Sequence, residues 1–417
     1  MKHLIIRNIG PIKEVNIELK RFNFFIGSQS SGKSTVAKIL STCEWIEKEV
    51  ETTRNEQAIG NGENFRQLVE SFHKMEDYFD QSEDSYVLYN TDYIELLYEH
   101  RELHVRLNRS VPYHRQKICY IPAERNMVTL PELKGFEFNT TNLRSFLFDW
   151  YRAREFYTPQ NKTNVLELGV QYYYDADKTT KNDRIQHING KTYDISLSNS
   201  SSGLQSLTPL IVMLQYYSNQ YFTEYDFKNS FNQDTKVKEM RSALTREVAL
   251  TLYKPGFSED EARDLVSQFN DELHRNVPRA VEIFKIYEEA CNRLLIPNRT
   301  TFIIEEPEQN LYPFTQVALL ESIVRLCNTN QNHGCTITTH SPFILNYLNV
   351  LIARYYKDIA NSTKLNPADV SAFVTDDGRL TDLMQQDMQT GEFSVNADDL
   401  VEAMRYMYNE YRQVKGQ

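Results

Sequence analysis

The chain has 417 residues, of which 41% are hydrophobic and 25% are charged, and its formal net charge is −11. These proportions are those of an ordinary globular protein, which excludes a fibrous chain and one that is disordered throughout. The acidic balance also argues against a body that coats nucleic acid through its overall field.

No stretch approaches the roughly 18 consecutive apolar residues that a membrane span needs. We therefore expect a cytoplasmic protein with no membrane partner. The five cysteines are scattered without a C-x-x-C pair, so the sequence predicts neither a disulfide framework nor a zinc site.

Hydrophobic patterning and breaks in composition divide the chain into five expected segments. Residues 1–50 hold N-terminal strands, a glycine-rich loop and a first helix, and residues 51–116 form an inserted surface subdomain. Residues 117–219 return to the core and carry a serine-rich lid, whereas residues 220–298 form a helical insertion. Residues 299–417 complete the core and end in a C-terminal helix. The predicted fold class is α/β, with an antiparallel N-terminal part and a mixed core sheet.

The first motif is GSQSSGKS, from Gly27 to Ser34, which fits G-x-x-x-x-G-K-[ST] between an apolar strand and a helical pattern. In such a P-loop, backbone N–H groups turn towards phosphates, the lysine reaches the β- and γ-phosphates, and the Ser hydroxyl ligates Mg²⁺. We therefore predict binding of ATP and Mg²⁺, with Ser34 as a metal ligand. The predicted nucleotide contacts are Gly27, Ser28, Ser30, Ser31, Gly32, Lys33, Ser34 and Thr35.

Two later strands end in side chains suited to phosphate chemistry. The stretch TFIIEEPEQNLYP predicts a strand that ends at Glu305 and Glu306. We assign Glu305 to the metal shell and Glu306 to the residue that polarises the attacking water. CTITTHSPFIL predicts another strand that ends at His340, where an imidazole could sense or stabilise the γ-phosphate.

A serine-rich turn, LSNSSSGLQS, precedes an apolar helix and contains Ser201, Ser202 and Gly203. Alone it reads as a helix N-cap. The chain order of P-loop, Ser-Ser-Gly, strand-Glu-Glu and strand-His resembles the ATPase head of the ABC superfamily. It is most similar to the branch that includes the SMC, RecF and OLD (overcoming-lysogenization-defect) proteins, and EEPE followed by THSP resembles OLD-like AAA-type ATPases of bacterial phage-defence systems.

The resemblance implies an ATPase that forms a homodimer or higher homo-oligomer. Ser201, Ser202 and Gly203 would contact the ATP bound by the other subunit, Glu306 and His340 would be catalytic, and Glu305 would hold the metal. Two positions depart from the family pattern: YIPAER, which falls where the Q-loop would lie, offers Glu124 and Arg125 in place of a glutamine, and Tyr312 replaces a histidine.

The stretch after His340 is too short for the Toprim nuclease domain of OLD nucleases, and Asp376-Asp377-Gly378 reads as a β-turn. We therefore expect the ATPase to gate a separate effector protein, a nuclease or a toxin, in antiviral defence.

Three alternatives stay open. The first is a RecF-like DNA-repair ATPase that binds DNA through the basic stretch Arg101–Lys117. The second is the nucleotide-binding subunit of a transporter, which the 102 positions between Gly203 and Glu305 disfavour. The third is a scaffold that holds ATP without turnover, which Glu306 and His340 disfavour.

Overall fold

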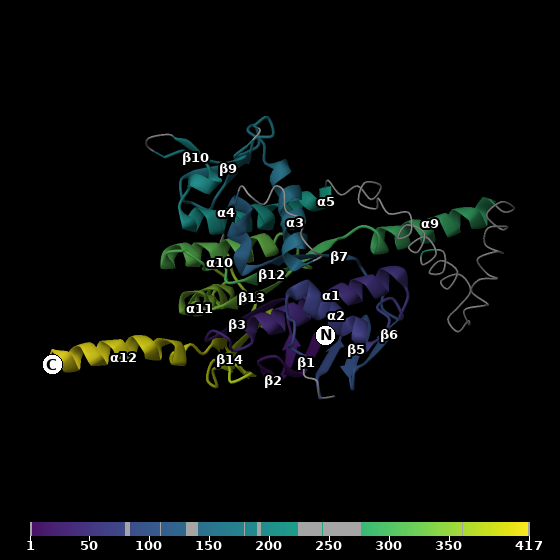
Figure 1. Ribbon diagram of the computed structural model, residues 1–417, viewed down its shortest axis with the longest axis horizontal. Helices are drawn as coiled ribbons and strands as arrows, with labels where there is room; N and C mark the ends of the chain where they lie inside the picture. Colours follow the sequence, from purple (N-terminus) through teal and green to yellow (C-terminus); the bar gives the residue numbers. More distant parts are fainter. Residues whose placement is uncertain are drawn as a thin grey trace.

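The computed structural model describes residues 2–79, 84–108, 110–130, 141–178, 180–189, 193–223, 244, 277–360 and 362–415. These residues build a mixed sheet of 11 strands, with helices on both of its faces (Figure 1). The strand order is β6-β5-β4-β1-β2-β15-β14-β3-β13-β12-β7. The predicted α/β class is confirmed.

One half of the sheet is antiparallel and is built around the N-terminal hairpin of β1 (Lys2–Ile9) and β2 (Ile12–Leu19). The predicted subdomain 51–116 contributes to this same half, because its first strand pairs with β1, with His3 opposite Asn90. Its three strands are β4 (Tyr86–Asn90), β5 (Ile94–Glu99) and β6 (Glu102–Leu107). The same range contains the helix α2 (Gly62–His73). The five-part division of the chain remains a prediction.

The other half of the sheet is parallel and places several loops at one edge. Its five neighbouring strands run in the same direction, so their carboxyl ends meet at that edge. They are β14 (Val370–Asp376), β3 (Phe22–Gly27), β13 (Gly334–Thr339), β12 (Arg299–Glu305) and β7 (Gln116–Ile121). The P-loop, both predicted catalytic strand ends and YIPAER all follow these strands directly.

Side chains alternate between the two faces of the sheet, and a separate core covers each face. Phe25 packs with α1 (Lys33–Thr53) and α2, whereas its neighbour Phe24 belongs to the larger core on the opposite face. Complete burial of each phenylalanine contributes about 1.5–3 kcal/mol. The helices of the larger core are α3 (Asn142–Phe156), α4 (Ser202–Gln215), α10 (Pro313–Cys327) and α11 (Pro342–Tyr356).

Smaller elements complete the described structure. A four-stranded sheet has the order β11-β10-β9-β8, in which β10 and β11 pair in antiparallel fashion. These strands are β8 (Thr163–Asn164), β9 (Val170–Tyr174), β10 (Asp183–His187) and β11 (Asp194–Ser196). A hairpin of β16 (Met384–Gln386) and β17 (Phe393–Val395) precedes the C-terminal helix α12 (Asp398–Val414), which extends away from the body (Figure 1).

Two predictions concern parts of the chain described only in part. Of the helical insertion 220–298, the structure describes the helix α9 (Val277–Leu294), and residues 224–243 and 245–276 lie outside the described part. The predicted turn at Asp377-Gly378 joins β14 to β15 (Arg379–Asp382), and both residues have positive φ angles, 44° and 72°. No helix among the described residues is long and apolar enough to cross a membrane.

Candidate functional site: a P-loop with converging carboxylates

The P-loop is a tight connection between β3 and α1, and its two glycines meet needs that no other residue meets. A Cβ on Gly27 would lie 2.3 Å from the backbone oxygen of Thr375 on the neighbouring strand. Gly32 precedes α1 with a φ of 104°, a conformation that L side chains rarely adopt. The loop can therefore take this close path only with glycine at both positions.

The Lys33 side chain folds back over the loop that precedes it. Its ammonium donates hydrogen bonds to the carbonyl oxygens of Gly27 at 3.0 Å and Ser28 at 2.6 Å. Burial lowers the pKa of Lys33, against the attraction of the carboxylates of Glu306 and Glu308, which favours the charged form. The ammonium thus lies in the field of both glutamates, where a phosphate would find a positive charge.

Glu305 ends β12 as a buried carboxylate with two hydroxyl donors. Ser34, at the start of α1, and Tyr120, on the adjacent β7, both donate to it. Burial raises the pKa of Glu305, against the effect of these two hydrogen bonds. A Ser hydroxyl and a carboxylate brought together are hard oxygen ligands of the kind that Mg²⁺ prefers. The two predicted metal ligands therefore come together and fit that ion.

Glu306 follows in an unusual backbone conformation, with a φ of 44°. For a residue other than glycine this costs of order 1–3 kcal/mol and persists only where the surroundings hold it. Its backbone N–H donates to the Thr338 carbonyl at 2.8 Å, and its carboxylate lies 3.6 Å from Nε2 of His340. The backbone N–H of His340 in turn donates to the Glu308 carboxylate at 2.6 Å. The structure thus brings together the two residues predicted to be catalytic.

Arg125 lies behind this turn as a completely buried guanidinium that donates only to carbonyl oxygens, over 2.8–3.3 Å. Its acceptors are the backbone oxygens of Pro122, Ser206, Glu305, Glu306 and Pro307. Burial lowers the pKa of Arg125 to about 10, against the attraction of the nearby glutamates. The side chain therefore fixes the backbone of the Glu305-Glu306 turn and ties it to α4.

The serine-rich turn is exposed and begins α4. The Ser201 hydroxyl caps the helix by accepting from the Leu204 N–H, and Ser202 is also exposed. A Cβ on Gly203 would lie 3.0 Å from the Asn310 carbonyl, and the Asn310 side chain donates to the Ser206 hydroxyl at 3.0 Å. The start of α4 thus packs directly on the segment after Glu306. The signature role of Ser201, Ser202 and Gly203 stays a prediction.

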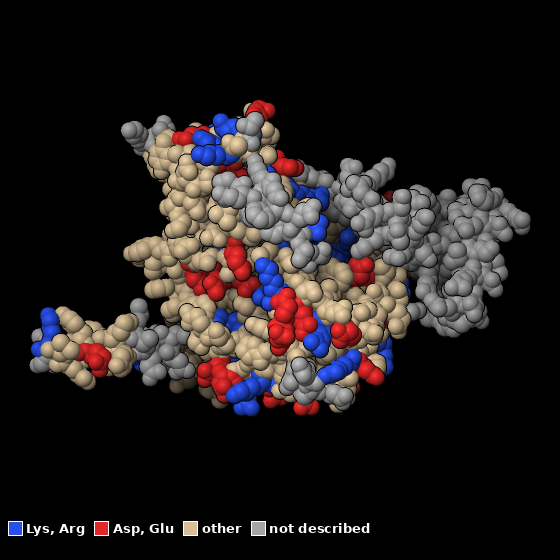
Figure 2. Space-filling model, viewed as in Figure 1, with Lys and Arg blue, Asp and Glu red and all other residues tan. Residues whose placement is uncertain are grey.

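The basic stretch Arg101–Lys117 does not present its charges as one free surface. Lys117 forms an ion pair with Asp149 at 2.6 Å, and Arg115 donates to the Leu295 carbonyl. Arg106 is exposed but lies 3.9 Å from Glu95, and residue 109 is outside the described part. Figure 2 shows basic and acidic side chains interspersed over the visible face of the described residues.

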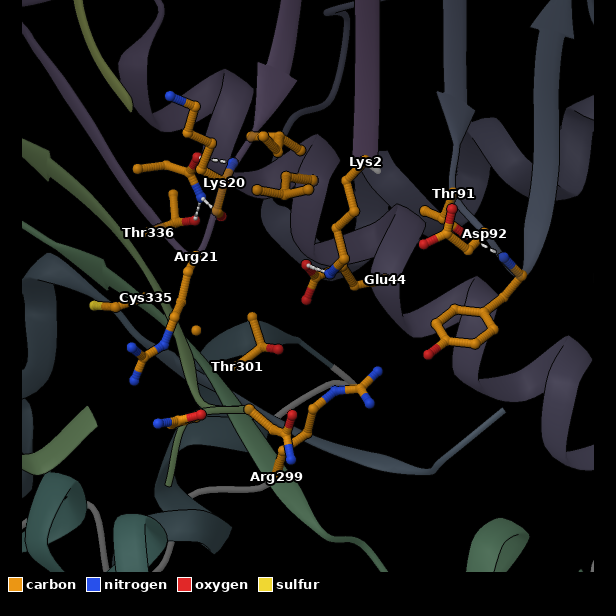
Figure 3. A pocket seen from close by; sticks show the side chains of 17 residues that line it. Lys2, Lys20, Arg21, Glu44, Thr91, Asp92, Arg299, Thr301, Cys335 and Thr336 are labelled. Carbon is orange, nitrogen blue, oxygen red and sulfur yellow. Dashed lines mark hydrogen bonds and ion pairs between the residues drawn. The ribbon is translucent and has the colours of Figure 1, made fainter. Parts of the chain in front are cut away.

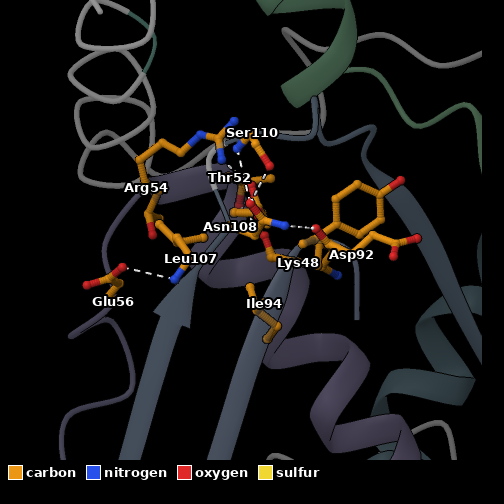
Figure 4. A network of polar contacts seen from close by, with 12 residues as sticks. Lys48, Thr52, Arg54, Glu56, Asp92, Ile94, Leu107, Asn108 and Ser110 are labelled. Carbon is orange, nitrogen blue, oxygen red and sulfur yellow. Dashed lines mark hydrogen bonds and ion pairs between the residues drawn. The ribbon is translucent and has the colours of Figure 1, made fainter. Parts of the chain in front are cut away.

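Polar contacts fix the path of the same stretch (Figure 4). Leu107 N–H donates to the Glu56 carboxylate at 2.9 Å, the Asn108 side chain donates to the Asp92 carbonyl at 2.9 Å, and Ser110 donates to Asn108. These contacts tie the end of β6 to the turn between β4 and β5 and to the chain after α1. These contacts therefore fix the conformation of this part of the stretch.

Three residues of the site carry roles that the sequence did not predict. Tyr120 and Arg125 lie in YIPAER, whose apolar strand and charged end signal only a return to the sheet. Glu308 is the last acid of EEPE, and its Oε2 atom is buried without a hydrogen-bond partner among the described residues. All three come to the site through parallel strands that lie far apart in sequence.

The sequence matches no protein-family model and no curated protein. Among solved structures, the SMC head domain from Thermotoga maritima is similar with a TM-score of 0.37 and 9% identity, over 91% of this chain and 97% of that chain. The recombination mediator protein RecF is similar with a TM-score of 0.29 and 10% identity, over 91% of this chain and 97% of that chain. A dimeric ATP-binding cassette bound to ADP and Pi is similar with a TM-score of 0.28 and 11% identity, over 90% of this chain and 96% of that chain. Because these TM-scores and sequence identities are low, the function of the site is inferred from the geometry of this chain.

Proposed function

We propose that this protein binds ATP with Mg²⁺ and hydrolyses it to ADP and phosphate. The observation that carries the proposal is the convergence of Lys33, Ser34, Glu305, Glu306 and His340 at the carboxyl edge of one parallel sheet. Each residue is the type that its expected role requires. This edge is also where open α/β sheets bind their ligands.

The expected chemistry follows from the positions of the side chains. The P-loop N–H groups and Lys33 bind the β- and γ-phosphates, and Ser34 and Glu305 hold Mg²⁺, which neutralises charge on the phosphate oxygens. Glu306 orients a water and accepts its proton as the water oxygen bonds to the γ-phosphorus. The bond from that phosphorus to the bridging oxygen breaks, and ADP leaves. His340 stabilises the γ-phosphate and is oriented by Glu308 through its backbone.

The exposed hydroxyl side chains of Ser201 and Ser202 support a dimeric switch, because they are accessible to a nucleotide bound by a second molecule. We propose a homodimer or higher homo-oligomer, closed by two ATP molecules, that gates a separate nuclease or toxin in antiviral defence. The support for the effector and for the defence role is the sequence resemblance of EEPE and THSP alone.

ATP turnover by the purified protein tests the enzymatic part. We expect Mg²⁺-dependent phosphate release from the wild type, a loss of at least 100-fold in Glu306→Gln with ATP binding kept, and no ATP binding in Lys33→Ala. Turnover by Glu306→Gln at the wild-type rate would overturn the assignment of that residue.

The proposed gating of an effector is tested with the protein purified from its native host, with and without Mg²⁺-ATP. A stoichiometric nuclease-like or toxin-like chain whose release depends on the nucleotide supports gating. An ATP-dependent dimer that carries DNA and no second chain would replace gating with the DNA-repair alternative.

A further inference from the structure

A cavity lies at the opposite edge of the sheet from the P-loop, where the parallel strands β3, β12 and β13 begin (Figure 3). Its volume is about 360 Å³, within the range of small-ligand sites. The walls come from the start of β1, the turn before β3, the middle of α1, the turn between β4 and β5, and the first residues of β12 and β13. Nothing in the proposed ATP chemistry uses this cavity.

The lining is basic although the chain as a whole is acidic. Four cations line the cavity against the two carboxylates of Glu44 and Asp92. The cations are Lys2, Lys20, Arg21 and Arg299. Lys2 and Glu44 face Arg299 across the hollow in Figure 3. The local excess of positive charge favours an anionic ligand over a cationic or neutral one.

The four cationic side chains differ in the hydrogen bonds and ion pairs that they make within the chain. Lys2 pairs with the buried Glu44 at 2.9 Å, and Arg21 donates to the carbonyls of Cys327 and His333. The side chains of Lys20 and Arg299 make no hydrogen bond or ion pair with any described residue. Arg299 is half-buried at the first position of β12. It is therefore a guanidinium in a cavity whose donors are not used within the described chain.

We propose that this cavity binds a small phosphorylated molecule, with a phosphate group held by Arg299 on the side of the cavity that faces Lys2. A guanidinium presents a planar fork of donors that matches two phosphate oxygens, and the Lys2 ammonium across the hollow adds a second positive charge. The ligand is distinct from the ATP of the P-loop, because the two sites lie at opposite ends of the same strands.

Inorganic pyrophosphate serves as the probe, and isothermal titration calorimetry measures its binding. The full-length chain carries Lys33→Ala, so that the P-loop does not contribute. We expect one site per chain in this background, and at least a 10-fold weaker affinity when Arg299→Gln is added. Arg106→Gln, which removes an exposed arginine on β6, is the matched control and should leave the affinity unchanged.

Thermal unfolding without ligand shows whether Arg299→Gln still folds, and Arg299→Lys, which keeps the charge, should retain more affinity than Arg299→Gln. Absence of binding in the Lys33→Ala background would overturn the proposal, as would equal affinity with and without Arg299. A duplex oligonucleotide that binds through Arg299 where pyrophosphate does not would overturn the small-ligand class. None of these results depends on ATP turnover, so the cavity and the proposed ATPase can fail separately.

Discussion

Arg125 offers a quantitative test of how the Glu305-Glu306 turn is held. Its guanidinium donates to five carbonyl oxygens, and a hydrogen bond to a charged group contributes about 1.5 kcal/mol at the low end, so the five together supply roughly 7 kcal/mol. The lowered pKa, about 10 against an ordinary 12.5, means that the site disfavours the charged form by about 3 kcal/mol after the attraction of the nearby glutamates is included. Arg125→Met should therefore lower the free energy of unfolding by about 4 kcal/mol.

The effect on turnover should be larger than a general loss of stability explains. Arg125→Lys keeps the charge but reaches fewer acceptors, so the carboxylate of Glu306 should move relative to the γ-phosphate. We expect kcat to fall at least 10-fold in Arg125→Lys while the Kd for ATP changes less than threefold, because the P-loop does not contact Arg125.

Urea unfolding and steady-state turnover measure the two quantities. Arg21→Met is the matched control, because Arg21 also donates to backbone carbonyls but at the far edge of the sheet. Arg21→Met should lower the free energy of unfolding. At urea concentrations below its unfolding transition, it should leave kcat unchanged. If Arg125→Lys keeps the wild-type kcat, Arg125 is only structural and does not position Glu306.

Three further predictions concern single residues. Gly27→Ala should abolish ATP binding, since its Cβ would clash with the Thr375 oxygen at 2.3 Å, and equilibrium binding of a fluorescent ATP analogue would show this; normal binding would mean that the loop takes another path. Tyr120→Phe removes one donor to Glu305 and should weaken Mg²⁺ activation of turnover severalfold in a Mg²⁺ titration, with the Kd for metal-free ATP unchanged. Burial lowers the pKa of His73 to about 3, below its ordinary 6.5, so the unfolded chain binds the extra proton and stability falls as the pH drops below about 6.5. Between pH 7 and pH 5 this costs about 2 kcal/mol, which His73→Phe should remove from the urea-unfolding free energy; an unchanged pH dependence would assign the effect to other groups.

The P-loop and the strand ends could be predicted from the sequence because each is local. The loop needs its glycines and Lys33 at fixed spacing, and an apolar run that stops at Glu305 signals both a strand and its edge. Because the carboxyl ends of neighbouring parallel strands meet at one edge of a sheet, these strand ends are then expected to lie together. The pairing of β4 with β1 could not be predicted in this way, since it joins residues about eighty positions apart, such as His3 and Asn90, and no local pattern records it.

Arg125 could not be assigned from the sequence for a related reason. Two of its acceptors, Ser206 and Glu305, lie 81 and 180 positions away, and they are backbone oxygens that every residue type carries. No side-chain pattern therefore marks them. The cavity around Arg299 is equally invisible, because its lining comes from the starts of strands that only the sheet order brings together.

If Glu306 hydrolyses ATP held between two copies of the chain, Glu306→Gln should trap the closed dimer. The most direct measurement is the solution mass of Glu306→Gln by mass photometry with Mg²⁺-ATP, beside the wild type and Lys33→Ala. We predict a stable species of at least twice the chain mass of 49.0 kDa for Glu306→Gln alone, because bound ATP would close the dimer and not be consumed. A Glu306→Gln protein that stays at 49.0 kDa with ATP bound would show that ATP does not close a dimer.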